Sequence, residues 1–376
     1  MPIVIQPYRE EHEPAVKALN QRLLRGLPDQ DLAFYESCCP SWLAKIEGSS
    51  LYNQYFVALE DGEVRGAYAL KYEKFYLAGQ GEHAVACYHH PLSEGVIDRK
   101  YSTVGGLLLR DALRREPMLY ALGMGSLDRP LPAMLKATGW SLQIVPFYFL
   151  VVHPYRFLRQ MAVLRQSGWR RWLMDAGAFT GTGWAVLAAA RGFRRLGRAQ
   201  FSAYDVEEFD SFLDWADDSW REAREAYLLA SVRDRETLAR LYPPSGPHLT
   251  KLCVRKEGGA VGWAVVGERR RDAKFGTLRV GSIVDCWALP ENAETVTRAA
   301  TRVLEQKGMD LIVSNQSHRQ WGRAMEVCGF FRAESNFIFA ASKKFDALLR
   351  QNNMDQHNLA NFHLTRANGD GLPRNF

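Results

Sequence analysis

The stretch DRKYSTVGGLLLRDAL, residues 98–113, joins a polar turn and a glycine pair to an apolar helical segment. The glycines are Gly105 and Gly106, and three leucines follow them directly. A helix start presents unpaired N–H groups and a partial positive charge, which suits an anion. Because glycine has no Cβ, a phosphate group could approach the backbone closely here. The same residues also suit a plain tight turn before a core helix, and both interpretations stay open at this point.

The pattern around this stretch predicts a first domain over residues 1–153, with element order β-α-β-β-β-α-β-α-β. A hairpin is indicated over residues 54–77, where Asp61 and Gly62 separate two runs rich in β-formers. The run MLYALGMG, residues 118–125, reads as a buried strand. The run QIVPFYFLVV, residues 143–152, then closes the domain as a strand.

The pattern recurs in the second half of the chain. MLYALGMG, PAMLKATGW and FYFLVV in the first half match MDLIVSNQ, RAMEVCGFF and FIFAAS in the second. Such an internal repeat predicts two copies of one architecture. We therefore expect a helical connector over residues 154–198, a second domain over residues 199–350, and a flexible tail over residues 351–376.

The composition is that of a globular protein, with 47% hydrophobic and 24% charged residues in a chain of 376. The net charge of +6 is mild and the arginines are scattered, so we expect no nucleic-acid partner. None of the six cysteines forms a C-x-x-C pair or has zinc spacing, which predicts free thiols and no metal. The first residues do not resemble a signal peptide, so a cytoplasmic location is expected.

One segment, residues 172–190, has some character of a membrane span, with arginines on both sides. It also carries Asp175 and several glycines and threonines, whereas a span needs about 20 predominantly apolar residues. The sequence favours a buried or interfacial helix, with peripheral membrane contact through residues 170–195 as an option.

The hairpin, the strand–turn–helix and the closing strand–helix–strand together resemble the GNAT superfamily of acyl-CoA N-acyltransferases, present here in tandem. The resemblance implies an α+β fold with two GNAT-like mixed-sheet domains joined by a helical connector. It also implies acetyl-CoA or another acyl-CoA as co-substrate. In that superfamily the turn reads R/Q-x-x-G-x-G/A and binds the pyrophosphate. The best alignment places Lys100 at the basic position, Thr103 at the first glycine and Gly105 at the second. The cofactor-binding residues it implies are Lys100, Ser102, Thr103, Val104, Gly105 and Gly106.

The second half departs from this pattern. Its corresponding segment, LPENAETVTRAATRVL, has no glycine at the turn. Glu291 and Glu294 would repel a pyrophosphate. We therefore expect the cofactor turn of the second domain to be degenerate, and the domain to serve structure or acceptor binding.

Acyl transfer to an amine needs a neutral amine, donors for the developing oxyanion and a proton for the leaving thiolate. The tyrosine that often supplies this proton in GNAT enzymes is replaced by Leu135 in one half and Met325 in the other. Glu94, just before the cofactor turn, is the predicted base, with a solvated or turn-capping carboxylate as the alternative. Tyr88 and Tyr148 are candidate acids, of which Tyr148 is preferred, with core packing as the alternative.

The acceptor is expected to meet polar side chains from both halves. His89 and His90 point to opposite faces of a strand, so only one can face a cleft. Asp285, a charge within an apolar strand, either pairs with an arginine or lines a cleft. Asn315 and His318 follow a buried strand where a helix begins. The predicted substrate-binding residues are His89, Asp285, Asn315 and His318.

These observations predict a transferase that moves an acyl group, acetyl in the first instance, from acyl-CoA to a primary amine. The acceptor would be a small molecule, an amino sugar or an amino acid. Two alternatives remain: a catalytically degenerate tandem-GNAT binding or scaffold protein, and a Fem-like transferase using an aminoacyl-tRNA or acyl-carrier donor. A homodimer is also left open.

Overall fold

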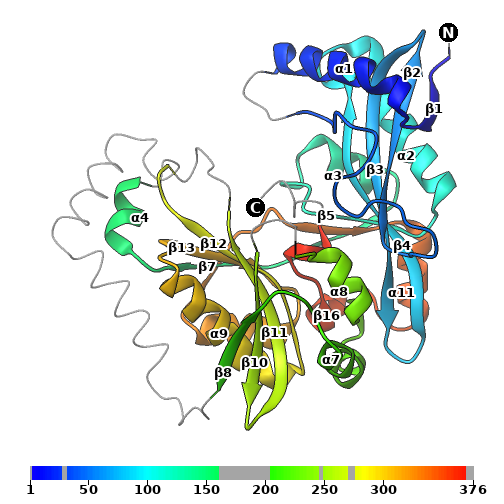
Figure 1. Cartoon of the computed structure of the whole chain (residues 1–376). Helices are drawn as coiled ribbons and strands as arrows, with labels where there is room; N and C mark the ends of the chain where they lie inside the picture. Colours follow the sequence, from blue (N-terminus) through cyan, green and yellow to red (C-terminus); the bar gives the residue numbers. More distant parts are fainter. Residues whose placement is uncertain (1, 28–31, 161–203, 245–248, 270–275, 370–376) are drawn as a thin grey trace. The chain divides into compact units, whose positions relative to one another are not determined.

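The structure, a computed structural model, describes residues 2–27, 32–160, 204–244, 249–269 and 276–369. The chain forms two compact units (Figure 1). Unit 1 comprises Met1–Ile144 and Ile338–His357, and unit 2 comprises Val145–Phe337 and Asn358–Phe376. Both units contain a mixed sheet with helices packed on it, which confirms the predicted α+β class.

Unit 1 is built on a sheet in which β4 and β5 run parallel, while the other neighbouring strands run antiparallel. The order across this sheet is β1-β2-β3-β4-β5-β15-β6. Its strands are β1 (Val4–Pro7), β2 (Tyr52–Glu60), β3 (Glu63–Leu77), β4 (Gly81–Ser93), β5 (Leu119–Leu122), β6 (Ser141–Ile144) and β15 (Ile338–Ala341).

The helices of unit 1 cover both faces of this sheet. They are α1 (Glu13–Gly26), α2 (Val104–Arg115), α3 (Pro130–Ala137) and α11 (Lys343–Gln351). Side chains alternate along each strand, so Phe56 and Tyr68 pack in one core with residues of α2. Their neighbours Val57 and Ala69 pack in the other core with residues of α1. Helix α2 packs beside β3 and β4 (Figure 1).

The predicted hairpin is confirmed as β2 and β3. Its turn residues Asp61 and Gly62 have φ angles of 53° and 79°, and positive values at both positions fit a type I′ turn. The hairpin of the second half, β10 and β11, turns in the same way through Glu257 and Gly258, at 52° and 82°. A residue with a Cβ is strained in this region, which explains a glycine in each turn.

Unit 2 repeats the arrangement, with β12 and β13 as its parallel pair. The order across its sheet is β14-β7-β13-β12-β11-β10-β8. The strands of this sheet are β7 (Phe147–Val151), β8 (Asp205–Phe209), β10 (Leu249–Lys256), β11 (Gly259–Glu268), β12 (Val280–Ala288), β13 (Leu311–Asn315) and β14 (Phe331–Ala333). Unit 2 also contains β9 (Leu229–Ser231) and β16 (Phe362–His363), which pair with each other in parallel. Its helices are α4 (Pro154–Gln160), α7 (Trp215–Ala223), α8 (Arg235–Leu241), α9 (Ala293–Gln306) and α10 (Arg319–Val327). Helix α9 lies against β11 and β12 (Figure 1).

The last predicted strand of each half belongs to the other unit, so the expected domain boundaries at residues 153 and 199 do not match the two units. The predicted strand FYFLVV forms β7, which pairs with β13 and β14 and so belongs to unit 2. The predicted strand FIFAAS forms β15, which pairs with β5 and β6 and belongs to unit 1. The edge positions they fill are chemically alike, because both strands are short and apolar, so local sequence does not distinguish the two sheets.

The expected flexible tail is wrong for its first part. Residues up to 369 include α11, the short helix η8 (Gln356–Asn361), β16 and η9 (Arg366–Asn368). Leu364 and Thr365 are completely buried, because hydrogen bonds satisfy the polar groups of this segment. Most of the expected connector lies outside the described residues, as does the stretch 170–195. Within the described part of the chain, no helix has the length and apolar character needed to cross a bilayer.

Candidate functional site

The central parallel strands of unit 1 separate soon after they meet. β4 and β5 pair at Ala86 with Leu119 and at Cys87 with Tyr120. β5 ends at Leu122, whereas β4 continues to Ser93 while still paired with β3. One backbone edge of residues 88–93 of β4 is therefore not hydrogen-bonded to β5. Such an edge offers N–H and C=O groups to an extended ligand.

A bulge changes the course of β4 just after this separation. Ala69 pairs with His89, but Ala67 pairs with Leu92, so β4 carries one extra residue. The extra length includes His90, whose φ of 52° lies in the left-handed region. Its ring Nε2 lies 2.7 Å from the carbonyl oxygen of Ala33, and its ring stacks on Phe34. A non-glycine residue held in this conformation costs about 1–3 kcal/mol and is often found at a functional site.

Tyr88 is the first residue of β4 after the segment that pairs with β5. Its side chain is 1% exposed, and its hydroxyl has no hydrogen-bond partner among the described residues. Burial raises the pKa of Tyr88, so the hydroxyl stays protonated at neutral pH. A buried hydroxyl without a partner carries a desolvation cost of about 1–3 kcal/mol. We interpret it as a group available to a ligand at the point where β4 and β5 separate.

The connection from β4 to α2 is a ten-residue turn, 94–103, folded as the short helices η2 (Glu94–Val96) and η3 (Arg99–Tyr101). Each begins at a capping side chain: Ser93 Oγ accepts from the N–H of Gly95 at 3.1 Å, and Asp98 Oδ1 accepts from the N–H of Lys100 at 2.9 Å. A Cβ at position 95 would collide with the Tyr101 carbonyl oxygen. The turn therefore requires a glycine at 95, a position that the sequence pattern did not single out.

Helix α2 begins with the predicted glycines in an open position. Its first main-chain bond is donated by Leu107 to the Thr103 carbonyl oxygen at 3.1 Å, so the preceding N–H groups lie before the helical ladder. A Cβ at Gly105 would have Met134 Sδ as its nearest neighbour, at 3.9 Å, and one at Gly106 would meet nothing within 4 Å. Ser102, Thr103 and Gly106 are exposed, and Val104 is buried. The structure thus groups the predicted cofactor-binding residues at one helix start.

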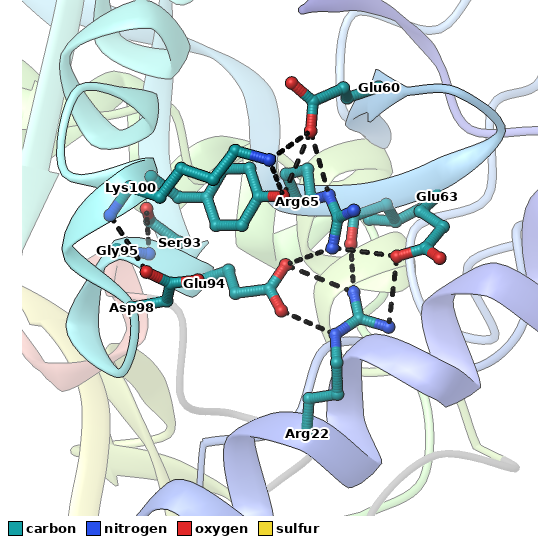
Figure 2. A network of polar contacts seen from close by, with 11 residues as sticks. Arg22, Glu60, Glu63, Arg65, Ser93, Glu94, Gly95, Asp98 and Lys100 are labelled. Carbon is teal, nitrogen blue, oxygen red and sulfur yellow. Dashed lines mark hydrogen bonds and ion pairs between the residues drawn. The ribbon is translucent and has the colours of Figure 1, made fainter.

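Glu94 lies at the start of this turn, in a network of charged side chains (Figure 2). Its carboxylate is 4% exposed. One oxygen accepts from Arg22 Nε at 2.6 Å, and the other accepts from Arg65 at 3.0 Å and Arg22 at 3.2 Å. Because both oxygens are engaged by guanidinium groups, the geometry favours a supporting role for this carboxylate. The predicted role of Glu94 as a base stays a prediction.

The far end of the turn is fixed through Tyr101, which is buried. Its hydroxyl donates to Glu60 at 3.0 Å and lies 3.1 Å from Lys100 Nζ, and Arg65 stacks on its ring at 4.5 Å. The hydrogen bond to Tyr101 and the charge of Glu60 raise the pKa of Lys100. The Lys100 side chain is 66% exposed, so its ammonium borders the solvent beside the start of α2. Arg65 thus links both ends of the turn, through its ion pair with Glu94 (Figure 2) and through its contact with the Tyr101 ring.

In unit 2 the corresponding connection is much shorter. Only residues 289–292 separate β12 from α9, and they contain the short helix η7 (Pro290–Asn292). Glu294, in the first turn of α9, pairs with Arg298 at 2.8 Å. A turn of this length with an acidic helix start offers no cradle like that of unit 1.

Asp285 of unit 2 is fully buried, and its carboxylate is hydrogen-bonded within the unit. Its Oδ2 accepts from Arg233 Nε at 2.8 Å and from the Tyr242 hydroxyl at 2.7 Å. Its Oδ1 accepts from the Thr365 hydroxyl at 2.8 Å. The carboxylate is thus paired with an arginine, and its predicted contact with a substrate stays a prediction.

Asn315 and His318 are also buried and internally bonded. Asn315 donates to the Pro146 carbonyl oxygen at 3.2 Å and accepts from Arg366 at 2.8 Å. His318 caps α10, its Nδ1 accepting from the N–H of Gln320 at 3.3 Å. Burial lowers the pKa of His318 to about 4, so the ring is neutral at pH 7. Their predicted contact with the acceptor stays a prediction.

The remaining predicted residues lie in different units. His89 is buried in β4 of unit 1, one residue beyond Tyr88. Tyr148, expected in the same domain as Glu94, belongs to β7 of unit 2. It packs so closely on α10 that any side chain at Gly322 would collide with its hydroxyl. Burial raises the pKa of Tyr148.

Sequence reasoning did not identify Arg22, Arg65 or Tyr101. Arg22 and Glu94 are 72 positions apart, and no local pattern connects them. An arginine in an otherwise amphipathic helix is ordinarily a solvated residue, so only the tertiary fold shows the pairing.

Comparison with known proteins gives structural similarity alone. No protein-family model and no curated protein matches the sequence. A protein of unknown function from Enterococcus faecalis V583, described as a "Probable N-Acyltransferase", has 10% identity and a TM-score of 0.51, over 93% of this chain and 75% of that one. N-myristoyltransferase of Saccharomyces cerevisiae, solved with myristoyl-CoA bound, has 9% identity and a TM-score of 0.50, over 91% and 83%. A tandem GNAT protein from the clavulanic acid biosynthesis pathway has 13% identity and a TM-score of 0.48, over 91% and 99%.

At these identities the likeness is one of fold. The chain therefore shares its fold with the probable N-acyltransferase and with N-myristoyltransferase. Its two mixed sheets, each with a parallel pair of strands, are the arrangement that the sequence predicts.

Proposed function

We propose that the protein is an N-acyltransferase that moves an acyl group, acetyl in the first instance, from acyl-CoA to a primary amine. The observation that carries the proposal is the arrangement in unit 1. There, β4 and β5 part at Tyr88, and β4 leads through a preformed turn to the glycine start of α2, whose Val104 shares a core with Tyr88. The fold neighbour solved with myristoyl-CoA is consistent with an acyl-CoA ligand. The predicted acceptors are a small-molecule amine, an amino sugar or an amino acid.

The phosphates of the cofactor would lie at the start of α2. The N–H groups of Gly105 and Gly106 supply donors, and the glycines leave room for phosphate oxygens. Lys100, already positioned by Tyr101 and Glu60, adds a positive charge from the side. A turn held in its binding conformation loses little entropy when the anion binds.

The acyl thioester would lie along the open edge of β4. An N–H group of residues 88–93 can donate to the oxygen of the thioester carbonyl as it becomes an oxyanion. The amine nitrogen attacks the carbonyl carbon, the C–N bond forms and the C–S bond breaks. The Tyr88 hydroxyl protonates the leaving thiolate, and water carries the proton lost by the nitrogen back to the phenolate. Amide and CoA thiol are the products, and the protons balance.

The test is release of CoA thiol from acetyl-CoA in the presence of amines, followed with a thiol reagent. The panel should contain an amino sugar, a free amino acid and a simple alkyl diamine, with acetyl-CoA alone as the blank. Amine-dependent thiol release together with the N-acetyl product supports the proposal. If acetyl-CoA binds but no amine accelerates thiol release, the binding or scaffold alternative is favoured. If acetyl-CoA does not bind, the CoA-dependent function fails.

A further inference from the structure

The central parallel strands of unit 2 also separate. β12 and β13 pair at Val280 with Leu311, at Gly281 with Ile312 and at Ser282 with Val313. Beyond these pairs, β12 continues to Ala288 along β11, and β13 continues to Asn315 along β7. Each strand therefore has an edge facing the gap, where unpaired backbone groups could receive an extended segment.

That gap contains a segment from the end of the chain, whose first residues, Phe362 and His363, also pair in parallel with Leu229 and Ala230 of β9. Gln316 and Thr365 form an antiparallel bridge. The Ser317 N–H donates to the Leu364 carbonyl oxygen at 3.1 Å, and the Leu364 N–H donates back to Ser317 Oγ at 2.8 Å. The Ser317 hydroxyl donates to the Phe362 carbonyl oxygen at 2.5 Å. Backbone pairing of this kind is how a sheet edge accepts a peptide.

Side chains on both strands recognise this segment. From β12, the Asp285 carboxylate accepts from the Thr365 hydroxyl at 2.8 Å. At the end of β13, Asn315 accepts from Arg366 at 2.8 Å. Arg233 and Tyr242 hold the Asp285 carboxylate from its other side, so its acceptor position is fixed before the segment arrives. The adjacent residues Thr365 and Arg366 thus each donate a hydrogen bond to unit 2, the hydroxyl to a carboxylate and the guanidinium to an amide oxygen.

The segment is as buried as a core strand. Leu364 and Thr365 are 0% exposed and His363 is 3% exposed. Its own turn is closed by a reciprocal cap, in which the Thr365 N–H donates to Asn368 Oδ1 at 2.8 Å and the Ala367 N–H donates to Thr365 Oγ1 at 3.3 Å. The polar groups that would make a free tail soluble are thereby satisfied inside unit 2.

We propose that the parted strands of unit 2 form a groove for an extended peptide, that residues 362–368 occupy it in cis, and that this occupant closes unit 2 to acyl-CoA. The last clause rests on the proposed function. A tethered segment binds with an effective concentration of about millimolar or higher, so a free ligand must displace it against that advantage. One chain then binds one acyl-CoA, at unit 1.

The test uses hydrogen exchange of the full chain, read at the amides of residues 362–368. Protection comparable to that of β13 is expected, and it should be independent of protein concentration and of added acetyl-CoA. Exchange at the rate of an unstructured tail overturns the proposal. Protection that appears only at high protein concentration also overturns it, since the occupant would then come from a second copy.

Two variants of one residue sharpen this test. Thr365→Val removes the hydroxyl that binds Asp285 and should raise exchange across 362–368 about tenfold or more. Thr365→Ser keeps the hydroxyl and should exchange like the parent. Thr250→Val, on β10, controls for the loss of a threonine elsewhere in unit 2. Equal exchange in the Val and Ser variants overturns the recognition by Asp285.

Stoichiometry separates this inference from the proposed function. Titration of the full chain with acetyl-CoA should give one site, whose binding Gly105→Asp weakens about tenfold or more. Two sites, or a site whose affinity Gly105→Asp leaves unchanged, overturn the closure of unit 2. If no acetyl-CoA binds at all, the proposed function fails, while the exchange measurement still decides whether residues 362–368 occupy the groove.

Discussion

Cys87 and Tyr120 are the last residues at which β4 and β5 pair, and the next residue of β4 is the buried Tyr88, whose hydroxyl has no hydrogen-bond partner in the part of the chain that the structure describes. Where these strands separate, one backbone edge of β4 has no partner in β5, and α2 packs against β4. Unit 2 has the same separation at Ser282 and Val313, but there the chain places its own residues in the gap. Among the described residues, the two units therefore differ in one respect: a segment of the chain lies between the separated strands of unit 2 but not between those of unit 1.

Tyr88→Phe tests the assignment of the acid. The variant loses the hydroxyl that would protonate the thiolate, but it keeps the ring that packs against Tyr68. We expect kcat to fall by about 10²-fold or more, while the Kd for acetyl-CoA changes little. Tyr52→Phe, on β2, is the matched control and should behave like the parent. Unchanged kcat in Tyr88→Phe would remove Tyr88 from the mechanism.

Glu94→Gln distinguishes a supporting carboxylate from a base. The change removes the buried anion between Arg22 and Arg65, which keep the more exposed Glu63 as a shared partner. We expect the free energy of unfolding to fall by about 1–3 kcal/mol, with kcat retained within about tenfold. Chemical denaturation and initial rates on the same preparation measure both quantities. A fall of about 10²–10⁴ in kcat with unchanged stability would instead support the base assignment.

Asp285→Asn tests the buried ion pair of unit 2. The variant leaves the Arg233 guanidinium, 3% exposed, without its anionic partner. Removing one member of a buried pair typically costs about 3–5 kcal/mol, and we expect a loss of that size in urea denaturation. Asp205→Asn, at the exposed start of β8, is the control. Equal stabilities of the two variants would show that the pair contributes little.

His318 predicts how stability depends on pH. The pKa of its buried ring is about 4, against 6.5 in the unfolded chain. Between these values the unfolded state binds a proton that the folded state does not, so stability falls as the pH drops from 6.5 to 4. The contribution is about 3 kcal/mol and is fully present above pH 6.5.

His318→Asn isolates this effect, because asparagine also caps a helix but does not titrate. The pKa of His363 is also lowered, first by burial and then by the charge of His318, and the part due to burial is common to both proteins and cancels in the comparison. Denaturation at pH 7 and pH 5 should show a flatter dependence for the variant. Parallel curves would mean that His318 is solvated in the folded chain.

The sequence predicts the local features of this fold well. Asp61 and Gly62 identify a hairpin because a tight turn needs positive φ angles at both positions, and Asp-Gly adopts them readily. The glycines at 105 and 106 likewise indicate a helix start. Both features depend only on neighbouring residues, so a single sequence is enough to find them.

Long-range relationships could not be predicted in this way. β7 and β15 are both short apolar strands, and nothing in their residues specifies which sheet they join. The tail is polar, and polar residues in sequence predict solvent exposure; only its partners Asp285 and Ser317 show that it is buried. Arg65 connects Glu94 to Tyr101 through the tertiary fold alone.

The most direct test of the central claim is acetyl-CoA binding to the full chain, compared with its Gly105→Ala and Gly105→Asp variants, by isothermal titration. A Cβ at 105 has no neighbour closer than 3.9 Å, so alanine should bind acetyl-CoA nearly as the parent does. Aspartate adds a negative charge at the helix start and should weaken binding about tenfold or more. That pattern would place the cofactor at the turn of unit 1. Equal binding by all three proteins, or no binding by the parent, would contradict it.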